Sequence, residues 1–417
     1  MKPIFRCALL LLILSQIPVT SLFSRNDTIR LSRSSGMKIG GFIRVDYFYD
    51  TRQMVDAVES LFSLYPMPQN LDNSGKDIHA VPGTNIASVT SRLNMRFFTP
   101  DVLGAKASAF LEFDFAGVSN TNGVRLRHAY LDFAWTKSNL LIGRTWHPLG
   151  NCMPAVLAIN TGAPFWIFNR SDQVRFNYSP GNWQFFATAS YQSEYASLGP
   201  AGRSTLYHRN AILPELTLNI EYHTPKTMIG IAGNTKTIKP RQFTVSPDNE
   251  ALYATHETLT TFSGQAYFQY QSNGWKVKAQ STYHQNMNES LTMGGYAVRT
   301  TDPVTGRETY TSSQYMNYWL NVVYGTKWQA GIFAGYLNSL GTLDKVTGAW
   351  YARDPNIKYM YRLSPHLIYN INNWHFGIEF ECTAASYGTI QENTCGKITD
   401  NRSVSNFRTL LSVCFYL

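Results

Sequence analysis

The chain has 417 residues, of which 15% are charged and 14% are aromatic, and its formal net charge is +9. Soluble globular domains carry about 25% charged residues, and a mean hydropathy of −0.21 is too low for a bundle of membrane helices. These values argue against helical transporters and disordered or collagen-like chains. They are typical of transmembrane β-barrels, in which polar and apolar side chains alternate along each strand.

The first residues have the features of a secretory signal peptide. Lys2 and Arg6 precede an apolar run from Ala8 to Val19, and small residues follow up to Ser21. A positive start, an apolar core of about a dozen residues and a small-residue cleavage site form such an export signal. The expected organisation is a signal peptide at 1–21, a short N-terminal segment at 22–36 and a single barrel domain at 37–417.

From Met37 onward, segments of about ten residues alternate in hydrophobicity and end at turn signals. Between positions 105 and 115, the odd-numbered residues are apolar, whereas Lys106, Glu112 and Asp114 occupy even positions. Alternate side chains of a strand point to opposite faces, and a cationic side chain that faces the middle of a bilayer costs about 2–4 kcal/mol. The charged face is therefore expected to line an enclosed lumen.

Short turns alternate with longer, polar connections along the rest of the chain. Seven short turns and eight longer loops, the last expected at 383–403, give sixteen strands with both termini on the short-turn side. An even number of antiparallel strands with short periplasmic turns and long extracellular loops is the pattern of bacterial outer-membrane barrels. The sequence thus predicts an all-β fold, a closed sixteen-stranded transmembrane antiparallel barrel, because an open sheet edge is not tolerated in lipid.

The loop from 147 to 168 differs from the other long connections. It contains no Asp or Glu and is rich in proline and aromatic residues, namely Pro148, Pro154, Pro164, Phe165 and Trp166. Connecting loops on a protein surface are polar and mobile as a rule. We therefore expect this loop to fold into the barrel and narrow the channel, with packing between subunits as the alternative.

Four tryptophans directly follow short turns and open outward-facing rows. They are Trp183, Trp275, Trp328 and Trp374. Tryptophan is enriched where a membrane barrel crosses the membrane–water interface. One such residue could belong to a packed core, but four at the same hairpin position indicate an aromatic girdle.

Several strings resemble the DcaP-like trimeric porins and occur in the same order along the chain. They are Ser91-Arg92-Leu93, LRHAYLDF at Leu126 to Phe133, LLIGRTW at Leu140 to Trp146, DQVRFNY at Asp172 to Tyr178, YRLSPHLIY at Tyr361 to Tyr369 and CTAASYG at Cys382 to Gly388. The resemblance implies a homotrimer of sixteen-stranded barrels in the bacterial outer membrane that admits small anionic solutes, dicarboxylates among them. The chain departs from the family in two places. Residues 22–36 are too short for a heptad coiled coil, and Arg144 stands where relatives often have Gln, a change that could alter the pore.

Strand parity places a set of cations inside the lumen. They are Arg44, Arg92, Arg96, Arg175, Lys276, Lys278 and Arg362. Most are expected to pair with inward-facing acids and hold the wall together. A hypothesised ladder that guides anions consists of Arg92, Arg96, Arg175 and Arg362, because rings of Arg or Lys favour anions and the guanidinium fork binds carboxylates. The predicted function is passive diffusion of small hydrophilic, preferably anionic solutes; the alternative is a plugged barrel acting as an adhesin or surface binding protein.

Other classes of function find little support. No outward-facing Ser–His pair of the kind found in outer-membrane phospholipases emerges from the nine histidines, so no catalytic residue, metal or cofactor is expected. Lys and Arg are dispersed, which argues against nucleic-acid binding. Cys382 and Cys395 could form a disulfide in an oxidising compartment. Expected partners are further copies of the chain, outer-membrane lipid and lipopolysaccharide, and small anionic solutes.

Overall fold

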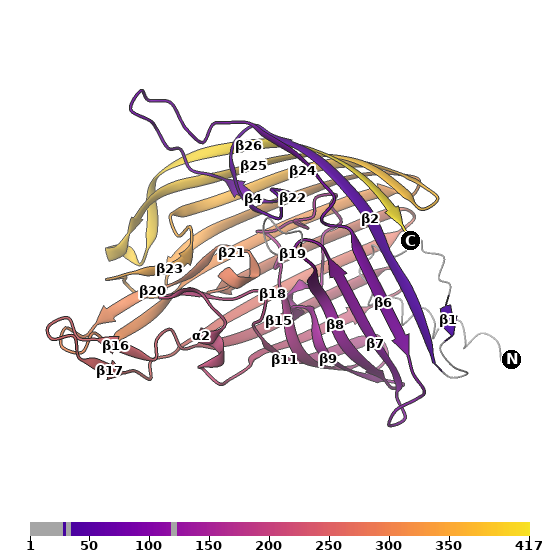
Figure 1. Cartoon of the computed structure of the whole chain (residues 1–417), viewed down its shortest axis with the longest axis horizontal. Coiled ribbons are helices and arrows are strands. Elements are labelled where there is room, and N and C mark those ends of the chain that lie inside the picture. Colours follow the sequence, from indigo (N-terminus) through magenta and orange to yellow (C-terminus); the bar gives the residue numbers. More distant parts are fainter. Residues whose placement is uncertain (1–27, 31–34, 118–122) are drawn as a thin grey trace.

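The structure is a computed structural model that describes residues 28–30, 35–117 and 123–417, so the predicted signal peptide lies outside the described residues. Sixteen antiparallel strands form a closed barrel (Figure 1). The wall consists, in chain order, of β2 (Gly36–Asp50), β6 (Arg92–Phe98), β7 (Lys106–Asp114), β8 (Arg125–Ala134), β9 (Ser138–Trp146), β10 (Arg170–Tyr178), β11 (Trp183–Tyr191), β14 (Glu215–His223), β15 (Thr227–Ile238), β18 (Leu259–Ser272), β19 (Trp275–Gln285), β21 (Glu308–Gly325), β22 (Trp328–Thr342), β24 (Ile357–Ile371), β25 (Trp374–Gln391) and β26 (Lys397–Tyr416). The predicted fold class is confirmed.

The barrel closes where the first and last wall strands meet. β2 pairs with β26 from Phe42 opposite Tyr416 to Asp50 opposite Arg408. The chain end lies beside β2 in Figure 1. β26 stops short of the beginning of β2, and there β1 (Thr28–Arg30) pairs with the first three residues of β2. Pairing of this edge satisfies backbone groups that have no partner in lipid.

Smaller elements lie in the loops. β5 (Gly83–Ala87) pairs with the C-terminal end of β2. Three further pairs of strands form hairpins: β3 (Met54–Ala57) with β4 (Phe62–Pro66), β12 (Leu198–Gly199) with β13 (Gly202–Arg203), and β16 (Phe243–Val245) with β17 (Leu252–Ala254). β20 (Gly294–Thr301) and β23 (Trp350–Arg353) pair with each other, and β20 also pairs with β21. Among the described residues, the helical elements are α2 (Leu206–Arg209) and 3-10 turns at Pro148–Gly150, Asn288–Ser290 and Glu392–Thr394. In the described ranges no helix is long and apolar enough to cross a membrane.

The two faces of the wall differ as strand alternation dictates. On β14, Leu216, Leu218 and Ile220 are exposed on the outside, while polar residues such as Glu215 and Glu221 are buried on the inside. The four tryptophans that follow short turns also lie on the outside. Each contacts an aromatic ring directly across the neighbouring strand, in the pairs Trp183–Tyr222, Trp275–Tyr324, Trp328–Tyr369 and Trp374–Phe415, with centroid distances of 5.0, 4.7, 4.5 and 4.8 Å.

The wall is much taller on one side than on the other. β6 has 7 residues and β9 has 9, whereas β25 has 18 and β26 has 20 (yellow in Figure 1). β25 and β26 remain paired up to Gln391 opposite Lys397, so the loop expected at 383–403 is confined to 392–396 and that expectation was wrong. Beyond the membrane the outward residues need not be apolar, so the hydrophobic alternation ends while the hydrogen-bonded ladder continues.

The possible disulfide does not form. Cys382 and Cys395 are both free. β25 continues from Cys382 to Gln391 as extended chain. At a rise of about 3.3 Å per residue, this places the two cysteines roughly 30 Å apart along the strand, far beyond bridging reach.

Candidate functional site

The loop from 147 to 168 lies against inward-facing side chains of the wall. Its residues Phe165, Trp166 and Ile167 are fully buried. Its backbone is held from several strands: Lys278 Nζ on β19 donates to the Met153 carbonyl at 2.8 Å, and Arg362 Nη1 on β24 donates to the Ala163 carbonyl at 2.8 Å. Contacts from well-separated strands mean that this loop crosses the interior of the barrel.

A second inward loop is the hairpin β3–β4. Arg362 Nη2 donates to the Leu64 carbonyl at 2.6 Å, and Ser63 Oγ donates to Glu381 of β25 at 2.9 Å. Arg408 of β26 donates to the Ser60 carbonyl at 2.8 Å. One wall arginine, Arg362, therefore binds the backbones of both inward loops at once.

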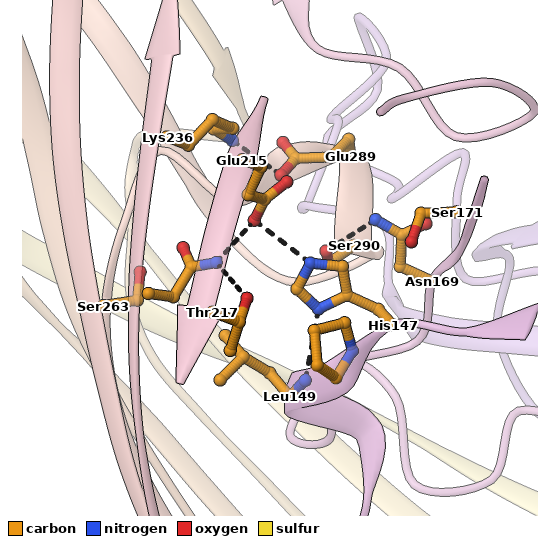
Figure 2. Close-up of polar contacts among 12 residues, drawn as sticks. His147, Leu149, Asn169, Ser171, Glu215, Thr217, Lys236, Ser263, Glu289 and Ser290 are labelled. Carbon is orange, nitrogen blue, oxygen red and sulfur yellow. Dashed lines mark hydrogen bonds and ion pairs between the residues drawn. The ribbon is translucent and has the colours of Figure 1, made fainter. Parts of the chain in front are cut away.

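A third inward segment, 286–293, follows β19. Its Glu289 accepts a hydrogen bond from Lys236 of β15 at 2.6 Å, and its Ser290 carbonyl accepts one from the Phe168 amide at 3.1 Å. Figure 2 shows Lys236 and Glu289 together, with Ser290 beside Asn169 at the end of the loop 147–168. The segment therefore joins the wall to that loop.

His147 fastens the start of the loop 147–168 (Figure 2). Its Nε2 lies 3.0 Å from Glu215 Oε1, and its Nδ1 accepts the Leu149 amide at 3.3 Å. With Nδ1 used as an acceptor, the ring proton lies on Nε2 and is donated to Glu215. Neither nitrogen remains for general-base chemistry. The described residues also contain no group of three or more His, Cys, Asp or Glu side chains placed to hold a metal ion.

The inward loops leave one part of the inner wall open. On β11, β14 and β18 the inward-facing residues are buried, in a regular alternation with exposed outward residues. On β6, β7 and β9, by contrast, nearly every residue on both faces is partly exposed. Since outward residues face the surroundings, the exposure of the inward ones means that solvent reaches the inner face of β6, β7 and β9.

The predicted inward cations fall into two groups. Arg92 and Arg96 lie on β6 of the open wall, and Arg175 lies on β10, which pairs with β9 at the edge of that wall. Arg96 lies over the Phe110 ring at 4.8 Å from its centroid and donates to Tyr130 Oη at 3.1 Å. Arg175 donates to the Trp146 carbonyl at 2.9 Å.

The second group holds the inward loops. Arg362 is 2% exposed and lies 3.3 Å from Glu381, and Lys278 binds the loop 147–168 as described above. Arg44 is paired with Asp46 at 2.8 Å and donates to the Leu157 carbonyl at 2.7 Å. Lys276 lies on β19, partly buried. Arg362 therefore does not share the open wall with the other members of the hypothesised ladder.

Two arginines that strand parity places outside in fact face inward. Between β7 and β8 the pairing runs Glu112 opposite His128 and then Phe113 opposite Leu126, so Arg127 is an extra residue in a β-bulge. A bulge shifts the alternation by one residue. Arg125 then lies opposite Asp114 and binds it at 2.7 Å, while Arg127 binds Glu112 at 2.8 Å. The run of charged residues that interrupts the alternation here was the available signal.

A cavity of about 170 Å³ lies where the open wall meets the inward loops. Its charged lining consists of Arg92, Arg125, Arg127, Arg203, Asp114 and Glu194, and its apolar lining comes from the three inward loops. Asp114 is bound by both Arg125 and Arg127, at 2.7 and 3.0 Å. Within the described residues, Arg92 and Arg203 donate no hydrogen bond, and the nearest acid to Arg92 is Glu112 at 4.0 Å.

The whole barrel is similar to solved outer-membrane proteins. It matches the outer membrane channel DcaP of Acinetobacter baumannii over 94% of this chain and 100% of that one, with a TM-score of 0.69 and 20% identity. The fold is that of the DcaP-like porins. OmpT of Vibrio cholerae is similar over 93% of this chain and 100% of its own, with a TM-score of 0.57 and 10% identity. Salmonella typhi OmpF in complex with daunomycin matches 94% and 100%, with a TM-score of 0.55 and 9% identity. No protein-family model and no curated protein sequence matches the chain.

The closed barrel with its apolar outer face indicates that the protein is located in the bacterial outer membrane. The departure at Arg144 concerns the outside of the wall and not the pore, so the expectation that it alters the pore was wrong. Arg144 lies opposite Asp172, 3.1 Å from it, in the outward rows that continue through Ile142 and Val174. The reason is the pairing register: Gln173 and Arg175 take the inward positions on β10, so Asp172 and its partner Arg144 face outward.

Proposed function

We propose that the protein is a porin through which small hydrophilic solutes, preferably anions, diffuse passively across the outer membrane. The observation that carries the anion preference is the charge of the cavity lining, where four arginines face two acids, an excess of two positive charges. Arg or Lys rings in a pore favour anions. The loop 147–168, which contains no Asp or Glu, adds no opposing charge.

The proposal extends to the assembly and its surroundings. We propose a homotrimer, and among the similar structures is a trimer form of Vibrio cholerae OmpT, with a TM-score of 0.54. In this arrangement the loop 147–168 is the constriction, the tryptophan rows lie at the interface, and lipid and lipopolysaccharide surround the outer wall. Residues 1–21 are the export signal. The dicarboxylates implied by the family resemblance belong to the proposed class of solutes.

A specific observation favours the second candidate, a plugged barrel that serves as an adhesin or surface binding protein. Three segments, 54–66, 147–168 and 286–293, enter the lumen, and most strands have buried inner faces. Conductance separates the two candidates. A trimeric pore inserted into a planar bilayer gives discrete current steps with three sub-levels, whereas a plugged barrel stays silent over many insertions.

Ion selectivity tests the charge argument directly. In a KCl gradient across the bilayer, we expect a reversal potential of the sign that indicates preferential chloride passage, because arginines outnumber acids in the cavity lining. Arg92→Gln should move this potential toward zero. Lys226→Gln, which removes the same charge from an exposed turn, is the control and should leave it unchanged. Cation selectivity of the unaltered protein would contradict the anion preference.

A further inference from the structure

The cavity beside Arg92 has one polar and one apolar side. The polar side includes Arg92 at the beginning of β6, Thr90 in the turn that precedes this strand, and Arg203 on β13. The apolar side is built by the three inward loops, through Val58, Phe62, Ile159, Phe168 and Leu291. A site of about 170 Å³ with this division is the size of a small organic acid and too small for a peptide or an oligosaccharide.

The polar side holds donors without partners. Arg92 Nε and Thr90 Oγ1 are both buried and have no hydrogen-bond partner among the residues that the structure describes, and Thr90 is only 3% exposed. A buried donor without a partner is costly, so most native structures satisfy such groups. A ligand that brings an acceptor to this side would satisfy both. Carboxylate is the matching group, because it accepts from a guanidinium fork and from a hydroxyl.

The acids that line the cavity are already bound by other arginines and do not compete with a ligand for Arg92. Arg125 and Arg127 bind Asp114, and Glu194 lies 3.2 Å from Arg170 and 3.4 Å from Arg125. Both lining acids are therefore already bound by arginines. The cationic groups that remain are those of Arg92 and Arg203, and they set the charge that an entering solute meets.

We propose that this cavity binds a monocarboxylate with a compact apolar body. The carboxylate lies at Arg92 and Thr90, and the body packs against Phe62, Ile159 and their apolar neighbours. The inference rests on the proposed porin function and narrows its solutes. A dicarboxylate of similar length fits less well, because it brings no apolar body to the side formed by Phe62, Ile159 and Leu291, and the free energy of burying that apolar surface is lost. The site makes passage saturable, since a bound solute occupies the open side of the lumen.

The test uses the full-length protein in a planar bilayer with three probes: 3-methylbutanoate, butanedioate and the uncharged 3-methylbutanamide. We expect 3-methylbutanoate to interrupt the single-channel current with a frequency that saturates with concentration. Butanedioate should bind about tenfold or more weakly because it lacks the apolar body that packs against the inward loops, and the amide should not interrupt the current.

Variants assign the effect to the cavity. Arg92→Gln should weaken the interruption by 3-methylbutanoate about tenfold, and the isosteric Thr90→Val should also weaken it about tenfold, the lower end of what one hydrogen bond to a charged group contributes. Lys226→Gln, again the matched control in an exposed turn, should bind as the unaltered protein does.

The possible outcomes separate a failure of the binding-site inference from a failure of the proposed porin function. If the channel conducts and prefers anions but shows no saturable interruption, the inference fails and the porin function stands. Equal or tighter binding of butanedioate also overturns the inference. If no insertion conducts, the porin function fails, and calorimetric titration of the detergent-purified protein with 3-methylbutanoate then decides whether the cavity binds it.

Discussion

Replacing Arg362 by Met should lower the free energy of unfolding by about 3–5 kcal/mol, the cost of removing one partner from a buried ion pair. Arg362 is 2% exposed, and its loss leaves Glu381, also 2% exposed, without this cation. It also removes the donors to the Ala163 and Leu64 carbonyls. Because those carbonyls belong to the loop 147–168 and the hairpin β3–β4, we also expect a larger and noisier single-channel conductance.

Unfolding in guanidinium chloride, followed by tryptophan fluorescence in lipid vesicles, measures the stability change. Arg96→Met is the matched control, because Arg96 lies on the open wall and binds Tyr130 instead of a loop; it should cost about 1 kcal/mol. Combining Arg362→Met with Glu381→Leu should recover part of the stability, since no unpaired charge is left. Unchanged stability and conductance in Arg362→Met would show that this arginine does not anchor the loops.

The barrel itself could be predicted because the bilayer imposes a simple rule on every wall strand. Residues such as Leu216, Leu218 and Ile220 must be apolar where they meet lipid, while the alternate positions are free to be polar. That rule also fixes which way most inward cations point. It loses its force outside the membrane, which is why the strand extension of β25 and β26 was not predicted.

The site was harder to predict because it depends on local departures from regular alternation. One extra residue at Arg127 brings Arg125 to the inner face, and no average property of the strand reveals it. The inward segment 286–293 is polar in sequence and resembles a solvated loop. It is buried because wall residues such as Lys236 supply its hydrogen bonds, and such long-range partners cannot be read from composition.

The second large change in stability is expected for a substitution on the outer face of the barrel. Leu218 is the central residue of the lipid-facing row of β14 and is 64% exposed. We expect Leu218→Arg to lower the free energy of unfolding in lipid vesicles by about 2–4 kcal/mol, the cost of a cationic side chain near the middle of the bilayer. Its neighbours across the sheet are the small residues Ala187 and Gly233, so the arginine side chain meets no steric obstacle. The loss of stability therefore measures the cost of placing the charge in the medium around the outer face.

The decisive comparison places the same charge at two different depths in the membrane along β14. Tyr222→Arg places the same charge in the same outward row but beside Trp183, at the proposed aromatic girdle, where the electrostatic cost falls to about 0–1 kcal/mol. Leu218→Ala removes the side chain without adding a charge and separates the loss of contact from the effect of charge. A cost at Leu218 no greater than that at Tyr222 would mean that this face of β14 does not lie in hydrocarbon. The assignment of lipid and lumen sides along the wall would then be wrong, and with it the inward placement of the arginines on which the proposed anion preference rests.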